Sequence, residues 1–177
     1  TKSVVMKLLL GFLTITLMYW LCMGSFSVVV LRALGTNGAN HFIQSCSENW
    51  NIRYSMTFRQ YYCLILGAGY LGFLFFGFLI MWVSAKTKSS VFAVLVPPLL
   101  LLFPMFLHEI YNYFMRKIIG LLPHWLVDIR QALRYQYLYK VCGHITCLVP
   151  IILILYSCLT VALIFLCYRE YRHKQIA

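Results

Sequence analysis

Several polar side chains in this chain could do chemistry if the fold brings them to one depth. His108 and Glu109 are neighbours at the end of a long apolar run, and an ionisable pair held in apolar surroundings is a functional site by default. These two residues are therefore candidates for a substrate pathway, whereas at a membrane surface they would only face head groups.

A second group follows in the next stretch of the chain, where Asp128 stands close to Arg130 and His124. This spacing favours an ion network over an acid–base pair. A membrane-embedded enzyme acting on lipids would need His108, Glu109, Asp128 and His144 to converge. No Ser-His-Asp, HExxH or paired-carboxylate motif is present, so we assign no catalytic, metal or cofactor residues and expect no enzyme. The lipid-modifying enzyme and a small accessory membrane subunit remain alternatives.

The composition identifies the medium around these residues. Hydrophobic residues make up 62% of the 177 residues and charged residues only 11%, against about 25% charged in soluble domains. A chain of this size cannot hide so much apolar surface from water, because small folds keep a large exposed fraction. The net charge of +11 comes from cations at the ends of apolar runs, where they can reach anionic head groups. Nucleic acid is therefore not an expected partner.

Apolar runs without charge recur along the chain, and a membrane span needs about 20 such residues. The run at 91–107 is shorter, but its helix could continue through His108 and Glu109 to Met115, and prolines within it predict a bend. The fold class is therefore all-α, a polytopic membrane protein of one transmembrane domain over residues 1–177. We predict four spans, over residues 4–33, 60–85, 91–115 and 145–168.

Local signals support these boundaries. Thr57 and Gln60 form a capping box at the start of the second span, and "GTNG" at 35–38 ends the first. Ala68 and Gly72 form a small-xxx-small pair that permits close helix approach. Gly69 and Gly72 are also weak candidates for a substrate pathway.

Two connections differ in length. We predict that residues 41–56 form an interfacial segment with a short surface helix. Residues 116–141 are expected to be re-entrant or interfacial, because "IIGLLPHWLVDI" is about half a span long and broken by Pro123. The residues Leu133, Tyr137 and Lys140 that follow have helical spacing.

Four spans place both termini on one side. The cation numbers on the two sides are nearly equal, but the segments on the termini side are shorter, and "YREYRHKQIA" is a compact basic tail. We therefore expect both termini in the cytoplasm. Lys2, Lys7, Lys86 and Lys88 would then face the cytoplasm.

Three stretches of the chain point to a known family: "TKSVVMKLLLGFLTITL", "LGTNGANHFIQ…SMTFRQYYCLILGAGYL" and "VSAKTKSSVFAVLVPPLLLLFPMF". They resemble bacterial ABC transporter permeases of the type-2 exporter family. The terminal "PIILILYSCLTVALIFLCYREYRHKQI" is also similar to these permeases, and Lys7 matches a lysine that opens a span in them. The resemblance extends over nearly the whole chain. It rests on the general character of the sequence and not on an invariant motif. Because such permeases usually have six spans, it implies that this chain is the C-terminal four-span portion of a longer one.

The resemblance implies a function and partners. The chain would be a permease subunit in a bacterial plasma membrane, exporting a peptide, lipid or drug-like substrate. It would pair with a second permease chain or a copy of itself, and two ATP-binding cassette subunits would bind ATP and Mg²⁺. This chain carries no GxxxxGK[ST] phosphate loop, so the ATP site would belong to those partners. Lys2, Lys7, Lys86 and Lys88 would face the ATPase subunits.

Overall fold

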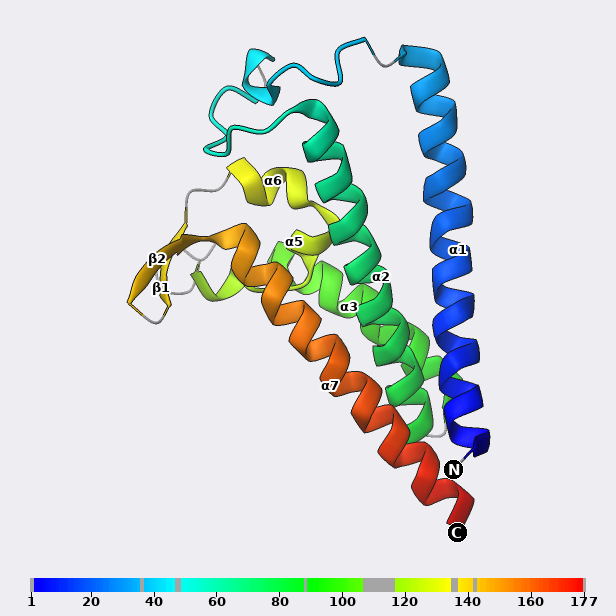
Figure 1. Cartoon of the computed structure of the whole chain (residues 1–177). Coiled ribbons are helices and arrows are strands. Elements are labelled where there is room, and N and C mark those ends of the chain that lie inside the picture. Colours follow the sequence, from blue (N-terminus) through cyan, green and yellow to red (C-terminus); the bar gives the residue numbers. More distant parts are fainter. Residues whose placement is uncertain are drawn as a thin grey trace.

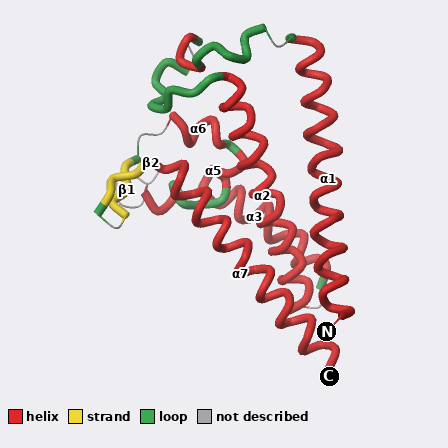
Figure 2. Tube along the Cα trace, viewed as in Figure 1, coloured by secondary structure: helices red, strands yellow, loops and turns green. Residues whose placement is uncertain are grey.

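The computed structural model of the chain describes residues 2–35, 37–46, 49–87, 89–106, 117–134, 137–141 and 143–176. The described part is mostly helical, with strands confined to one small hairpin (Figure 2). The elements in chain order are α1 (Lys2–Leu34), the 3₁₀ turn η1 (Ile43–Ser45), α2 (Phe58–Thr87), α3 (Ser90–Phe106), α5 (His124–Val127), α6 (Ile129–Arg134), β1 (Leu138–Val141), β2 (His144–Cys147) and α7 (Leu148–Ile176).

Among the described residues, α1, α2 and α7 are long and apolar enough to cross a membrane, and α3 contains a shorter apolar stretch. Many large apolar side chains on these helices face outward, including Leu10 at 65% exposure and Phe165 at 67%. Such a surface would be costly in water, at about 25 cal/mol per Å² of apolar area. The predicted class of helical membrane protein is therefore supported.

The long helices alternate in direction along the chain (Figure 1). The first turn of α1 and the last turns of α2 and α7 lie at one end of the molecule, and the connection between α1 and α2 lies at the other. Helix α2 is central, because it contacts α1, α3, α5, α6 and α7. Its buried residues recur at helical spacing and include Ala68, Gly72, Phe75 and Phe78.

The predicted helix boundaries around the first connection agree with the structure. Gly35 adopts a φ of +73° and its N–H bonds to the carbonyl of Leu31, which ends α1. At the start of α2 the Thr57 N–H donates to Gln60 Oε1 at 3.0 Å, and the Gln60 N–H donates to Thr57 Oγ1 at 3.4 Å. The capping box read from the sequence is therefore present.

The surface helix expected within residues 41–56 is only the three-residue η1. The other described residues of this segment form turns and irregular backbone, closed by a bridge between Phe42 and Thr57. Gln44 Nε2 donates to the carbonyls of Ile52 and Tyr54 at 3.1 and 3.0 Å. Asparagine and serine side chains in this stretch compete with backbone hydrogen bonds, which disfavours a longer helix.

The third predicted span is α3, which the structure describes as far as Phe106; its predicted continuation, with His108 and Glu109, lies outside the described residues. Pro97, Pro98 and Pro104 all lie inside α3.

The segment before α7 corrects two predictions. Lys140 lies in β1 and Tyr137 precedes it outside any helix, whereas residues 145–147 belong to β2 and not to the last span. The strands pair antiparallel around Gly143, whose φ of +85° is readily adopted only by glycine. Tyrosine, valine, isoleucine and threonine favour strands, so the helical spacing here was misleading and the all-α class is wrong in this detail. Helix α7 begins at Leu148, with Pro150 tolerated in its first turn.

Helix α1 packs against glycines of α2, and this predicts a difference between two of them. A Cβ at Gly77 would collide with the side chain of Ile15, whereas a Cβ at Gly67 would meet nothing within 4 Å. We expect Gly77→Leu to lower the free energy of unfolding by about 1–3 kcal/mol through overpacking. The matched control Gly67→Leu should cause no loss, because it also removes a glycine from a helix interior. Thermal unfolding in detergent measures both, and equal losses would contradict this packing.

Candidate functional site

The short helices between α3 and α7 lie against the middle of the central helix. Leu126 of α5 is fully buried, and a Cβ added at Gly72 of α2 would stand 3.4 Å from its Cβ. Gly72 lies about 21 Å along α2 from Phe58, at a rise of 1.5 Å per residue, which is close to the midpoint of that helix. The connection therefore does not stay at the level where α2 begins.

Local sequence explains why this connection is compact. Turns precede α5, and Pro123 stands at its N-terminus. Asp128 then caps α6, because its Oδ1 accepts the N–H of Gln131 at 3.2 Å. Helix α6 buries Ile129, Ala132 and Leu133, spaced three and four residues apart, and so presents one apolar face to the core.

Side-chain hydrogen bonds attach the connection to its neighbours. Tyr156 of α7 donates to the carbonyl of Leu121 at 2.9 Å, and Tyr139 of β1 donates to the carbonyl of Lys117 at 2.8 Å. The Leu121 carbonyl belongs to a turn, and irregular backbone needs such partners where water is scarce. Tyr156 could have been noticed in the sequence, since it is a hydroxyl-bearing residue inside an apolar run.

Arg134 at the end of α6 joins this connection to the other one. Its Nη2 donates to Asn49 Oδ1 at 3.1 Å, across the two irregular connections. Helix α6 also contacts α2 and α7. The hydrogen bond between Arg134 and Asn49 therefore ties the two connections together.

His124 is a titratable group of this region whose surroundings perturb it. Its ring lies 4.7 Å from that of Trp125, and its Nδ1 is buried without a hydrogen-bond partner among the described residues. Burial lowers the pKa of His124, although the nearby charge of Asp128 opposes the shift. The structure thus brings His124 and Asp128 onto one turn, where the Asp128 N–H bonds to the His124 carbonyl at 3.0 Å.

The enzyme alternative needed His144 and the pair His108–Glu109 to join Asp128. His144 lies on β2 opposite Val141, with an exposed side chain, and His108 and Glu109 are outside the described residues. Within the described ranges, no three histidine, cysteine or acidic side chains gather into a group that could hold a metal ion.

The two glycines predicted for a substrate pathway face other side chains. A Cβ at Gly69 would stand 2.9 Å from Tyr19 Oη of α1, and Gly72 faces Leu126 of α5. Tyr19 Oη itself donates to the carbonyl of Leu66 at 2.6 Å. Both glycines therefore lie at helix contacts.

Further hydrogen bonds follow the same interface between α1 and α2. The hydroxyl groups of Thr16 and Tyr70 share a hydrogen bond of 2.9 Å, and the Tyr62 hydroxyl donates to Ser27 Oγ at 2.5 Å. Interhelical bonds of this kind typically stabilise membrane helix pairs by about 0.6 kcal/mol each. Nothing in the spacing of these residues along the chain predicts that they pair.

The predicted cytoplasmic cations lie at the end where the termini meet (Figure 1). Lys2 and Lys7 are exposed at the start of α1. Lys86 is exposed at the end of α2, where its Nζ stands 5.2 Å from the centre of the Trp82 ring. Lys88 is outside the described residues.

Comparisons with known proteins add no relative: no protein-family model, no curated protein and no solved structure matches this chain.

The buried imidazole predicts a pH dependence. Because its pKa is lowered from 6.5 on folding, His124 binds a proton less readily in the folded than in the unfolded state. The free energy of unfolding should therefore fall as the pH drops from about 7 to about 5. His124→Phe should flatten this part of the profile, as measured by thermal unfolding in detergent.

The control is thermal unfolding of the wild type and His124→Phe at pH 8. At that pH the imidazole is neutral in the folded and the unfolded state, so only the packing of the side chain differs. A slope between pH 7 and pH 5 that is unchanged in His124→Phe would contradict the assignment.

Proposed function

We propose that this chain is the four-span portion of a permease subunit in an ATP-driven ABC exporter of the bacterial plasma membrane. The observation that carries the proposal is the packing of Leu126 against Gly72, which puts a half-length helical connection at the middle of α2. Short helices that enter the bundle between two long ones fit a re-entrant connection. In the family that the sequence resembles, such a connection lies on the outer face.

The arrangement of the helices supports the same proposal. Helices α1, α2, α3 and α7 alternate in direction, so α3 completes four crossings if its apolar stretch continues beyond Phe106. Lys2, Lys7 and Lys86 are exposed where the first turn of α1 meets the last turn of α2, and Arg134 joins the two connections nearer the other end. A transporter needs such a division, because one end faces the ATPase subunits and the other releases the substrate.

The packing also indicates where motion could occur. Helix α1 contacts α2 and α7 and exposes most of its surface, whereas α2 and α7 share the core with α5 and α6. ATP-driven rocking would then move α1 against a more rigid unit of α2, α5, α6 and α7. The exposed face of α1 is available to a second permease chain.

Association with an ATP-binding subunit tests the proposal. The tagged full-length protein, purified in mild detergent from its own cells, should carry a second polypeptide that contains a P-loop and hydrolyses ATP. Lys86→Glu should reduce the yield of that polypeptide several-fold, because Lys86 lies at the end proposed to face it. Arg59→Glu, at the opposite end of the same helix, is the matched control and should leave the yield unchanged.

Absence of any ATP-binding polypeptide from the wild-type preparation would refute the permease proposal. Loss of partner in both variants would mean that Lys86 does not mark the contact.

The proposed orientation has its own test. A green fluorescent protein fused after Ala177 should be fluorescent, and alkaline phosphatase fused at the same position should be inactive, because both termini are proposed to be cytoplasmic. A fusion within the loop that holds Trp50 should show the opposite pattern. Active phosphatase at the C-terminus would reverse the orientation.

A further inference from the structure

The short helix α5 keeps its position through the packing of its side chains. It has four residues, of which Trp125 and Leu126 are buried, and a Cβ at Gly72 of α2 would stand 3.4 Å from the Cβ of Leu126. Its own backbone adds little, a bond of 3.0 Å from the Asp128 N–H to the His124 carbonyl. A single helical turn is unstable by itself, because nucleation costs more than one hydrogen bond returns. Helix α5 therefore stays in place only while its side chains are held.

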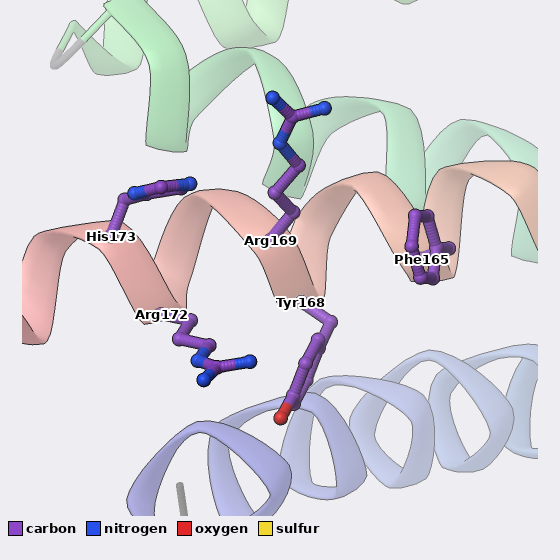
Figure 3. Close-up of a pocket in the computed structure, with 5 residues that line it drawn as sticks. All are labelled: Phe165, Tyr168, Arg169, Arg172 and His173. Atoms are coloured by element: carbon purple, nitrogen blue, oxygen red, sulfur yellow. The ribbon is translucent and has the colours of Figure 1, made fainter.

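His124 is the first residue of α5 and differs from the other described histidines. Its side chain is half-buried, its ring lies 4.7 Å from that of Trp125, and its Nδ1 is buried without a hydrogen-bond partner among the described residues. His41, His144 and His173 are exposed. Figure 3 shows His173 on the C-terminal part of α7, where it lines an open pocket. Among the described histidines, the charge of His124 is therefore the one that affects packing.

A proton on this imidazole does not suit the closed arrangement. The neutral ring can keep Nδ1 as a bare acceptor, whereas the imidazolium carries an N–H group on both nitrogens. A buried charged donor without a partner costs more free energy than a buried neutral acceptor, because the charge loses more hydration energy. Movement of the ring into water removes this cost. The same movement breaks the contact with Trp125 that helps to hold α5.

Water must reach α5 for this movement, and two exposed charges indicate where it does. Asp128, directly after α5, and Arg130 of α6 are both exposed. Charged side chains at membrane depth face water or other charges, because hydrocarbon does not solvate them. Asp128 is also the charged group that acts on the imidazole of His124. An imidazolium is therefore attracted toward this exposed side.

The other elements around α5 add no group that titrates in the same pH range. Arg130 and Arg134 of α6 are charged throughout it, and both act on Tyr61 of α2. Tyr61 and Tyr156 of α7 are phenols, which do not titrate below pH 8. The described part of α3 contains no ionisable side chain. Among the described residues around α5, His124 is thus the group that changes charge between pH 7.5 and pH 5.

We propose that α5 is a pH-sensitive latch, in which uptake of a proton by His124 releases α5 and the start of α6 from the middle of α2. The closed form keeps Leu126 against Gly72, and the open form uncovers this glycine. The latch depends on packing alone and needs no ATP-binding partner. Its use as a gate rests on the proposed transport function, because Gly72 is one of the residues predicted for the substrate pathway.

Hydrogen–deuterium exchange of the full-length protein in phosphatidylcholine nanodiscs tests the latch, because this lipid does not titrate between pH 7.5 and pH 5. The measured amides are those of α5 and α6, corrected for the intrinsic pH dependence of exchange. An open-form imidazole with a pKa of about 6.5 raises the open population by up to about thirtyfold over this range. Protection of residues 124–134 should therefore fall about tenfold or more, whereas protection of the middle of α2 and of α7 should stay unchanged.

Variants separate titration of His124 from its packing. His124→Phe and His124→Gln cannot take up the proton and should abolish the pH response; the second keeps a polar side chain and remains decisive if the first does not fold. His144→Phe and His173→Phe remove exposed histidines and should respond like the wild type.

Three results would overturn the latch. The first is a fall in wild-type protection of less than about threefold. The second is an undiminished response in His124→Gln, or its loss in either control variant. The third is an equal loss of protection in α2 and α7, which would mean that the whole protein unfolds and that α5 does not open by itself.

Discussion

Close approach of other elements to the small residues of α2 is the constraint on which the rest of the structure depends. Tyr19 of α1 occupies the space beside Gly69, Leu126 of α5 the space beside Gly72, and Ile15 of α1 the space beside Gly77. Lipid chains are as apolar as the side chains they replace, so burial of apolar surface gives little drive for helices to associate. Tight packing and hydrogen bonds between helices must supply it. A helix with larger residues at these positions could not hold partners on several faces at once.

The second requirement concerns the backbone of the connection between α3 and α7. Carbonyls of Lys117 and Leu121 accept hydrogen bonds from Tyr139 and Tyr156, and Asp128 caps the helix that follows. A polar backbone group without a partner is costly away from water, and irregular segments persist at depth only where protein groups satisfy them. These tyrosines therefore permit the connection to lie against the middle of α2. The close packing at Gly72 and the tyrosine bonds act together on one segment.

The two ends of the molecule have different physical characters. One end has connections joined by the hydrogen bond between Arg134 and Asn49. The other has helix ends with exposed Lys2, Lys7 and Lys86. These lysines suit contact with an anionic lipid surface or an acidic partner.

The sequence alone determined the medium, the long helices and several of their ends, because these depend on local properties. Apolar runs, the Thr57–Gln60 capping box and the glycine at position 35 act through residues that are close in the chain. Only the tertiary structure decided that residues 138–141 pair with residues 144–147, that Leu126 meets Gly72, and that Tyr156 binds the Leu121 carbonyl. Leu126 is far from Gly72 in the sequence, and Tyr156 is far from Leu121. A periodic pattern of apolar residues does not show which helix packs against which. Strand pairing likewise depends on the partner strand, so a helical spacing of Tyr137 and Lys140 could not exclude it.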